Sequence, residues 1–551
     1  MIQNITSVNY SKYFLKMFVR DKLLKRFEEE YALLNQQQRK AVDQIEGPVM
    51  VIAGPGTGKT QILSARIGKI LLSDAHIEPN NILCLTYTEA GVVAMRKRLS
   101  QFIGPDSYKV AIYTFHAFCN EVIQDNLNLF DKTTLDPLSD LERIELMKEL
   151  IDGFDKNHPL KRFRGDVYFE IYGLQYLFSQ MKREGLTSDF ICKKVDEYLK
   201  DLPNREEFIC KRASKDYKKG DIRWDKIEDI RQRMEKLQAA CNEFNKFQQL
   251  MRSRNRYDFD DMINWVIEAF ESNENLLRTY QEQYQYILVD EYQDTSGSQN
   301  RIVELLINYW DKPNVFVVGD DDQSIYRFQG ANVENMLAFA ESYKTDLLTV
   351  VLENNYRSVQ PILDISKTLI ENNQERLVKQ IEGLHKELKA SHEIMKTLKH
   401  VPFICEYETQ RDEMINTTLQ VEKLIKQGVP GNTIAIIYRE NKYGDELSNY
   451  LRLRNLPFYS KRSLNILDQP LIRQLLLFLN YLSAEHAIPF SGDDLLFQLL
   501  HLEWLDIPPI EIAKASMHVS ELNYKNRPVS LRQWLYEQRQ KLTNYVFFIC
   551  V

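Results

Sequence analysis

The feature that most constrains this chain is a glycine-rich turn that follows a short apolar run near residue 50. Residues 49–53 are apolar, rich in β-branched side chains and of strand length, and a helical pattern begins after the turn. Glycines allow backbone N–H groups to close around an anion, and the start of a helix adds further donors. The pattern predicts a phosphate-binding loop between a buried strand and a helix. Its residues are Ala53, Gly54, Pro55, Gly56, Thr57, Gly58, Lys59 and Thr60.

Polar residues in two distant stretches suit a nucleotide bound with magnesium. Lys59 is predicted to reach the β- and γ-phosphates of ATP, and the Thr60 hydroxyl to bind Mg²⁺. Asp290 and Glu291 directly follow the apolar run 286–289. We expect Asp290 to hold the Mg²⁺ through water and Glu291 to take a proton from the attacking water. One compact site then requires the long helical stretch between them to be an insertion between strands of one sheet.

The alternation of strand, polar end and helix predicts a parallel α/β sheet. Apolar runs at 82–85, 110–113, 314–320 and 348–352 indicate further strands, and 433–438 a last one in a second α/β unit. The carboxyl ends of parallel strands share one edge of the sheet, where ligands bind. Residues 119–255 are helical in pattern, and their mixed basic and aromatic residues suit either a nucleic-acid groove or a solvated surface.

Composition argues against several classes of protein. The chain has 71 Lys and Arg against 78 Asp and Glu, a net charge of −7, so a uniformly basic nucleic-acid coat is excluded but a local basic groove is not. The seven cysteines form no C-x-x-C pair, which favours a reducing cytosol over disulfides or a zinc site. No apolar run approaches the roughly 18 residues of a membrane span. We therefore expect a cytoplasmic protein.

Other polar and aromatic residues are candidates on chemical grounds alone. The Gln38 amide can donate to and accept from an adenine, and Gln323, at a predicted strand end, can sense the γ-phosphate. Arg357 carries the fixed, always charged fork of an arginine finger. Tyr326 and Phe328 suit either base stacking or ordinary core packing, and their spacing does not decide between the two.

Taken together, these stretches resemble the UvrD/Rep-type superfamily 1 DNA helicases between about Leu34 and Leu482. The matching stretches are Leu34–Gln38 (Q motif), Ala53–Thr60 (motif I), Thr86–Arg98 (Ia), Thr114–His116 (Ib), Asp258–Asp261 (the stretch before Walker B), Val289–Thr295 (II), Val318–Ala331 (III), Asn355–Ser358 (IV) and the strand segment Ile434–Asn441. The resemblance implies an α/β RecA-like P-loop NTPase core with helical insertions and an incomplete second RecA-like lobe. It also implies ATP hydrolysis with Mg²⁺, 3′-to-5′ movement on single-stranded DNA, and unwinding at single-strand/duplex junctions.

The resemblance assigns roles to residues. It implies that Gln38, Arg66 and Tyr356 surround the adenine. It places Lys59, Thr60, Asp290, Glu291, Gln323 and Arg357 in the hydrolysis site, with Arg357 supplied by the second lobe when the cleft closes. It implies DNA contacts for Thr86, Tyr87, His116, Tyr326 and Phe328.

The resemblance also divides the chain into domains. These are an N-terminal extension (1–27), two parts of a first RecA-like lobe (28–118 and 256–340), a helical insertion between them (119–255), the N-terminal part of a second lobe (341–464) and the start of its helical insertion (465–551). The oligomeric state is not indicated by the sequence.

The chain departs from the family pattern at several positions. Glu89-Ala90 stands where Asn-Lys is usual, Phe328 replaces a tryptophan and Gln329 an arginine, and nothing resembles motifs V and VI. We therefore expect a form truncated before motifs V and VI, and the sequence does not decide whether it hydrolyses ATP or is inactive. Two other readings remain open at this point: a subunit of a helicase–nuclease, and a module that binds ATP or DNA without turnover.

Overall fold

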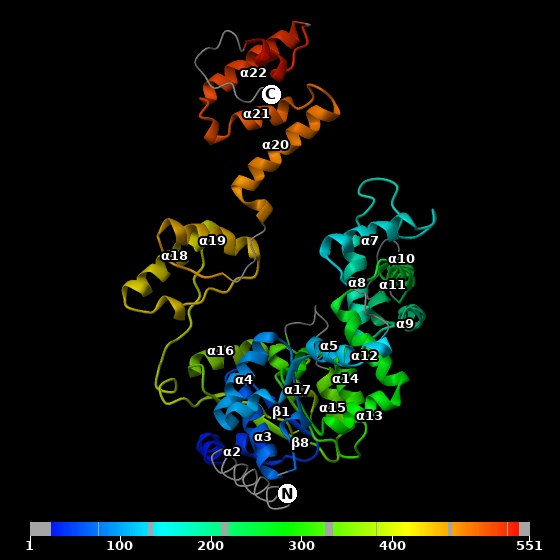
Figure 1. The fold of residues 1–551 in the computed structure, drawn as a ribbon, viewed down its shortest axis with the longest axis vertical. Helices are drawn as coiled ribbons and strands as arrows, with labels where there is room; N and C mark the ends of the chain where they lie inside the picture. The colour runs from blue at the N-terminus through cyan, green and yellow to red at the C-terminus, as the bar shows by residue number, and fades with distance from the viewer. Residues whose placement is uncertain are drawn as a thin grey trace, which may run out of the picture. The chain divides into compact units, whose positions relative to one another are not determined.

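The structure is a computed structural model of the chain. It describes residues 24–538 except 75, 131–135, 211–217, 219, 325–333, 382, 461–465 and 526. The chain divides into two compact units, residues 1–403 and 404–551, which are described separately below (Figure 1). Within the described residues, no helix is both long and apolar enough to cross a membrane.

A six-stranded parallel sheet forms the centre of the first unit. Its strands lie in the order β3-β2-β6-β7-β1-β8. They are β1 (Val49–Ala53), β2 (Ile82–Thr86), β3 (Ala111–Thr114), β6 (Tyr286–Val289), β7 (Val315–Gly319) and β8 (Leu348–Leu352). Every residue of β1, β2, β6 and β7 is buried, which explains their continuous apolar runs, since both faces of the sheet are covered. The predicted parallel α/β core is confirmed.

Helices cover both faces of this sheet (Figure 1). On one face, Val49 and Val51 of β1 pack with α2 (Gln36–Asp43), α3 (Lys59–Ser73) and α4 (Glu89–Ile103). On the other, Met50 and Ile52 face a second core. This alternation follows from the two-residue period of a strand. The second core is built with α5 (Phe115–Asp125), α12 (Phe259–Ser272), α13 (Glu274–Gln283), α14 (Gly297–Ile307) and α15 (Glu334–Ser342).

The helical stretch between α5 and α12 has a core of its own, formed around Leu146, Phe178 and Met251. A parallel ladder between β4 (Asp136–Pro137) and β5 (Arg256–Tyr257) joins the two ends of this stretch, so the chain leaves and re-enters the sheet region close together. The expected insertion within one sheet is therefore confirmed. Its helices are α6 (Leu127–Phe130), α7 (Asp140–Asp152), α8 (Ile171–Glu184), α9 (Ser188–Asp201), α10 (Trp224–Asn242) and α11 (Phe244–Ser253).

Strand β8 belongs to the first sheet. It pairs in parallel with β1 from Val49↔Leu348 to Ala53↔Leu352, so the boundary predicted at residue 341 precedes the last strand of this sheet. The reason is that β1 offers an open ladder edge, which the five-residue run of β8 completes. Beyond it lie β9 (Asn354–Asn355) paired with β10 (Lys389–Ala390), α16 (Gln360–Ile370) and α17 (Leu377–Gln380). The division into two lobes otherwise stays a prediction.

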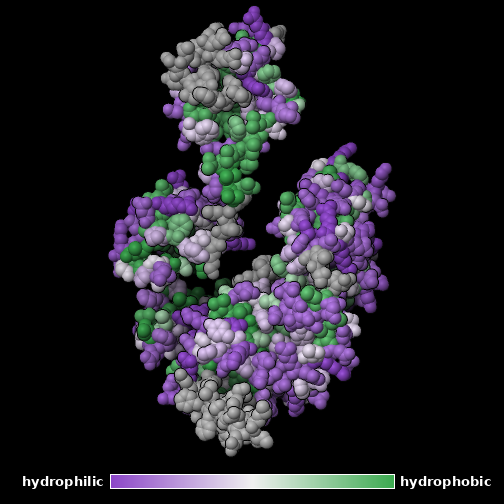
Figure 2. All heavy atoms as spheres, viewed as in Figure 1, coloured by the Kyte–Doolittle hydropathy of each residue, from purple (hydrophilic) through white to green (hydrophobic). Residues whose placement is uncertain are grey.

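The described residues of the second unit form helices joined by irregular chain, and none of them forms a strand. The strand predicted at 433–438 is wrong: a short 3₁₀ turn, Gly431–Thr433, is followed by irregular chain, and Ile437 is 95% exposed. A strand needs a neighbouring backbone to pair with, and no described segment pairs with this run. On α20, Leu471, Leu475 and Leu479 are exposed and form an apolar surface (Figure 2). The helices are α18 (Gln410–Lys426), α19 (Asn441–Leu453), α20 (Pro470–Ala487), α21 (Asp493–Leu500), α22 (Pro509–Tyr524) and α23 (Leu531–Gln538).

The packing of α3 against the sheet generates a first prediction. Ile67 of α3 is fully buried, whereas Val93 of the neighbouring α4 is 67% exposed. We expect Ile67→Ala to lower the free energy of opening the sheet by about 2–5 kcal/mol, because it leaves a cavity, and Val93→Ala to change it by less than about 0.5 kcal/mol. Hydrogen exchange of the β1 amides measures this unit alone. Equal protection in the two variants would contradict the layer arrangement.

Candidate active site

The glycine turn, Gly54–Gly58, connects β1 to α3 and has the backbone of an anion-binding loop. Gly56 (φ +71°) and Gly58 (φ +92°) lie in the left-handed region, which favours glycine. The Thr57 hydroxyl donates to the Gly54 carbonyl at 2.8 Å and holds the turn closed. Gly58 caps α3, whose first turn contains Lys59 and no acidic residue. The positive end of a 15-residue helix therefore meets the turn with nothing negative in its first turn.

The order of the strands brings distant residues to this turn. Strands β6, β7, β1 and β8 are neighbours and run parallel, so their carboxyl ends lie in a row. Asp290 follows β6, Asp320 follows β7, the glycine turn follows β1, and Asn355 lies shortly beyond β8. The sheet thus assembles one site from four stretches that are far apart in sequence.

Lys59 and Glu291 form an ion pair across this edge. Lys59 Nζ lies 2.7 Å from Glu291 Oε2, and the two side chains are 11% and 34% exposed. Glu291 adopts a left-handed backbone (φ 49°, ψ 46°), which costs a non-glycine residue about 1–2 kcal/mol. Such strain is concentrated at functional sites, where the surrounding structure enforces it. The predicted proximity of the loop lysine to the twin acids is confirmed.

Two carboxyls beside this pair are buried. Burial, followed by the negative charge of Glu291, raises the pKa of Asp290 to about 7, although Lys59 opposes the shift. The same two causes raise the pKa of Asp294 to about 6. The Oδ1 atom of Asp294 is buried without a hydrogen-bond partner. Oxygen ligands held in a cluster short of positive charge suit a hard divalent cation, so the carboxylate of Asp290 fits the predicted Mg²⁺. Thr60 follows Lys59 in the first turn of α3, and its hydroxyl as a second ligand stays a prediction.

Gln293 links the ends of β6 and β7, a role that the sequence analysis missed. Its amide nitrogen donates to Glu291 Oε2 at 3.0 Å and to Asp294 Oδ2 at 3.1 Å. Its amide oxygen accepts from the backbone N–H of Asp320 at 2.8 Å. The Gln293 amide therefore fixes Glu291, the candidate general base, relative to the end of β7. The sequence feature that could have identified Gln293 is its position among the acidic residues of the run Asp290–Asp294.

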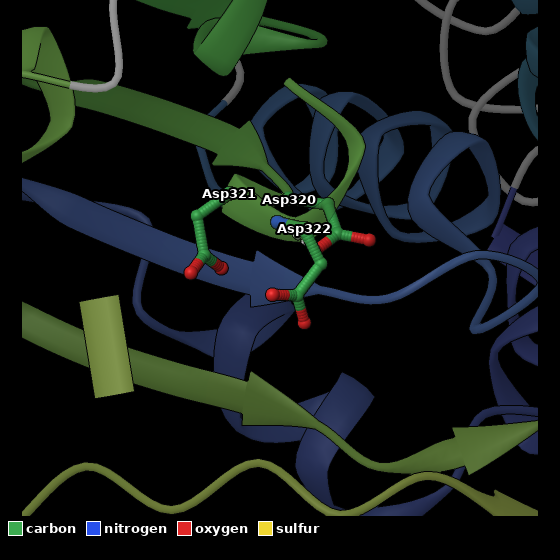
Figure 3. Close-up of side chains that lie close together, drawn as sticks. All are labelled: Asp320, Asp321 and Asp322. Atoms are coloured by element: carbon green, nitrogen blue, oxygen red, sulfur yellow. Dashed lines mark hydrogen bonds between the residues drawn. The ribbon is translucent and has the colours of Figure 1, made fainter. Parts of the chain in front are cut away.

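Three aspartates after β7 form a network of ion pairs with basic residues of the chain. The carboxylates of Asp320, Asp321 and Asp322 lie close together, with ligand atoms within 4.8 Å of one another (Figure 3). Lys386 contacts all three, and Arg376 donates to Asp322 at 2.7 and 2.9 Å. Burial alone would lower the pKa of Lys386, but the three carboxylates raise it above its ordinary value. Cations of the chain thus already balance this cluster.

The predicted γ-phosphate sensor, Gln323, joins this network. Its amide nitrogen donates to Asp320 Oδ2, so in this structure the side chain is turned toward the network. Through Asp320 and Gln293 it is connected to Glu291. The sensing role stays a prediction.

The NYR segment, Asn355–Arg357, packs directly on the glycine turn. Asn355 is fully buried and donates to the Pro55 carbonyl, while its oxygen accepts from the Arg357 N–H at 2.9 Å. The Tyr356 N–H donates to the Gly56 carbonyl at 2.8 Å. A Cβ on Gly56 would lie 2.6 Å from the Arg357 Cβ, so the arginine backbone touches the turn. The backbone at Arg357 therefore lies next to the first sheet, shortly after β8. Delivery of its guanidinium by a second lobe stays a prediction.

Gln38 and Tyr356 lie beside the turn, as the resemblance implies. Gln38 is 3% exposed; its amide donates to the Thr57 carbonyl at 2.9 Å and accepts from the Asn35 N–H at 3.0 Å. Asn35 in turn donates to the Tyr356 hydroxyl at 2.9 Å. The Gln38 amide thus braces the glycine turn in this structure, and its reading of adenine stays a prediction.

Arg66 does not face this region, which corrects its expected role. It is 1% exposed and donates to the carbonyls of Ala41, Gln44 and Ile45, at the end of α2. Its guanidinium lies over the Phe316 ring, 4.4 Å from the centroid. Burial lowers its pKa to about 9. An arginine so placed satisfies the last carbonyls of a helix.

The residues predicted to contact DNA are only partly described. Thr86 ends β2 and is 2% exposed, and Tyr87 follows it, half-buried. His116 lies in the first turn of α5, with Nε2 3.9 Å from Asp260 Oδ1. Tyr326 and Phe328 fall outside the described residues.

Comparison with known families agrees with this geometry. Residues 34–344 match the UvrD/REP helicase N-terminal domain, which is more than half of the chain, and residues 350–545 match the UvrD-like helicase C-terminal domain. The chain belongs to the UvrD/REP helicase family. The glycine turn and the paired acids lie within the first of these two matches, and the NYR segment within the second.

Curated relatives carry the name ATP-dependent DNA helicase PcrA. The protein of Staphylococcus epidermidis is 27% identical over 495 residues, and that of Staphylococcus aureus 26% over 495 residues. In both cases the match covers 89% of this chain and 58% of the relative. This UvrD/REP family member thus spans somewhat more than half the length of these relatives.

The raised pKa of Asp290 generates a second prediction. The pKa is near 3.8 in the unfolded chain and about 7 in the folded one, so ionising the buried carboxyl destabilises the fold as pH rises between these values. We expect Asp290→Asn to be about as stable as the wild type near pH 4 and more stable by a few kcal/mol above pH 7. Urea unfolding without divalent cations measures the difference. If the difference in unfolding free energy between Asp290→Asn and the wild type were the same at every pH, the raised pKa assigned to Asp290 would be contradicted.

Proposed function

We propose that this chain is the ATP-hydrolysing core of a DNA helicase that moves 3′ to 5′ on single-stranded DNA and opens duplex at single-strand/duplex junctions. The observation that supports this best is the Lys59–Glu291 pair, 2.7 Å apart, which joins the residues that follow β1 and β6, the strands on either side of β7. Membership of the UvrD/REP helicase family supports the DNA substrate. A cytoplasmic location is part of the proposal and agrees with the scattered cysteines.

The glycine turn and Lys59 would bind the triphosphate of ATP through backbone N–H groups and one ammonium. Thr60 and Asp290 would hold Mg²⁺, which neutralises charge that develops on the phosphates. Arg357 touches the turn through its backbone and carries a guanidinium suited to phosphate oxygens.

Binding and base activation are coupled in this arrangement. We propose that Lys59 shifts from Glu291 toward a phosphate when ATP binds, which leaves the Glu291 carboxylate free to accept a proton from water. Gln293 keeps hold of Glu291 through its 3.0 Å hydrogen bond, so the carboxylate stays oriented when the lysine moves. Nucleotide arrival therefore prepares the base.

A connected path runs from this base toward a predicted DNA contact region. Gln293 joins Glu291 to Asp320, and Asp320 joins Gln323 and Lys386. Tyr326 and Phe328, proposed to stack on bases, follow within a few residues. We propose that loss of the γ-phosphate is transmitted along this path to Gln323 and Lys386.

The two central residues generate a third prediction. Lys59→Ala should weaken Mg-ATP binding at least about tenfold, because it removes a charge from the phosphates. Glu291→Gln should bind Mg-ATP but lower kcat by about 10²–10⁴, because an amide cannot act as a base. Lys69→Ala, on the exposed side of the same helix, is the matched control. Calorimetric titration and phosphate release measure the two steps.

Two outcomes would count against this scheme. Lost nucleotide binding in Glu291→Gln would place Glu291 in binding and not in catalysis. Nucleotide binding without hydrolysis by the wild type would favour the module that binds ATP without turnover.

Coupling to DNA generates a fourth prediction. Single-stranded oligo(dT) should raise the ATP hydrolysis rate of the wild-type chain, because the path from Glu291 to the DNA contact region works in both directions. The stimulation should vanish in Glu291→Gln. An unchanged rate at saturating oligonucleotide would contradict the coupling, while leaving the nucleotide site as described.

A further inference from the structure

Helix α8 of the insertion presents a face of exposed aromatic rings. Tyr172 is 77% exposed and Tyr176 58% exposed. They are four residues apart, so they lie one above the other on the same side of the helix. Phe169, just before the helix, is 57% exposed. We call Phe169, Tyr172 and Tyr176 the aromatic track.

One end of this face is anchored next to a predicted DNA contact. Ser179 and Arg183 continue the face of Tyr172 and Tyr176 at spacings of three and four residues. Both donate to the same carboxylate oxygen, Oδ2 of Asp260, at 3.1 Å. The other oxygen of Asp260 is 3.9 Å from His116 Nε2. The face therefore runs from His116 along α8, away from the sheet and toward α7 (Figure 1).

The other end of the face carries positive charge and further aromatic surface. The Arg162 guanidinium stacks over the Phe169 ring, 3.8 Å from its centroid, and also pairs with Glu170 at 2.7 Å. Phe163 is 67% exposed. Lys161 and Arg164 flank these residues, in a chain whose net charge is −7. Local basic charge combined with exposed rings is the chemistry that recognises a single nucleic-acid strand: phosphates meet the cations and bases stack on the rings.

We propose that the aromatic track binds the bases of single-stranded DNA and continues the strand's path from His116 along α8. The inference rests on the proposed function and adds a site to it. From Tyr172 to Arg183 the helix rises about 16 Å, the length of a few nucleotides. Bases in a duplex are already stacked on each other and do not offer their faces to these rings, so the site selects unpaired strand.

The test uses the whole chain and a labelled oligo(dT) in an anisotropy titration. Tyr172→Ala with Tyr176→Ala should weaken binding about a hundredfold, tenfold for each lost ring. The slope of affinity against salt should stay the same, because no phosphate contact is removed. Tyr172→Phe with Tyr176→Phe keeps both rings and should restore the affinity.

Tyr108→Ala is the matched control. Tyr108 is 74% exposed but lies before β3, at the opposite end of the strands from the glycine turn. Its loss should leave the affinity for oligo(dT) unchanged.

Oligonucleotides with abasic positions separate stacking from other causes. The wild type should bind the abasic strand more weakly than oligo(dT), and this difference should be smaller in the double alanine variant, which retains only the other proposed base contacts. If the wild type binds oligo(dT) and the double alanine variant binds it as tightly, the aromatic track is wrong and the proposed function stands. If the wild type binds no single-stranded DNA, the proposed function itself fails. If the double alanine variant lost as much affinity for a blunt-ended duplex as for oligo(dT), the proposed selectivity for unpaired strand would be overturned.

Discussion

The ion pair between Lys59 and Glu291 is the contact on which the site depends. It joins the helix after β1 to the end of β6, across the whole helical insertion. The β4–β5 ladder makes this possible, because it returns the chain to the sheet where it left. The parallel order of β6, β7, β1 and β8 then places the acids, the glycine turn and the NYR segment along one edge. Every proposed step of hydrolysis uses this shared edge.

Two groups of buried acids lie at this edge, and they are balanced differently. Asp320, Asp321 and Asp322 are matched by Lys386 and Arg376, so this group is held together by the chain's own cations. Asp290 and Asp294 share a single neighbouring lysine with Glu291, and burial raises the pKa of both. A charge deficit of this kind favours binding of an external cation. The difference explains why the magnesium is assigned beside Thr60 and not to the aspartate triplet.

The sequence alone predicted the elements that short sequence patterns determine. Apolar runs located β1, β2, β6, β7 and β8, and the glycine spacing located the turn. The run at 433–438 has the same composition but no strand, since strand formation depends on a partner backbone. The burial of Arg66 and the pairing of Lys386 depend on distant residues, which spacing alone does not reveal. Gln293 was overlooked because its two partners lie on different strands.

The central claim is that one triphosphate and its metal lie between the glycine turn, Asp290 and the NYR segment. A crystal structure with a non-hydrolysable ATP analogue and Mn²⁺, located by its anomalous signal, tests it most directly. We predict a manganese peak between Thr60 and Asp290, with Lys59 moved from Glu291 onto a phosphate. A nucleotide bound elsewhere, or a manganese ion in the Asp320–Asp322 triplet with the Lys59–Glu291 pair intact, would contradict the account.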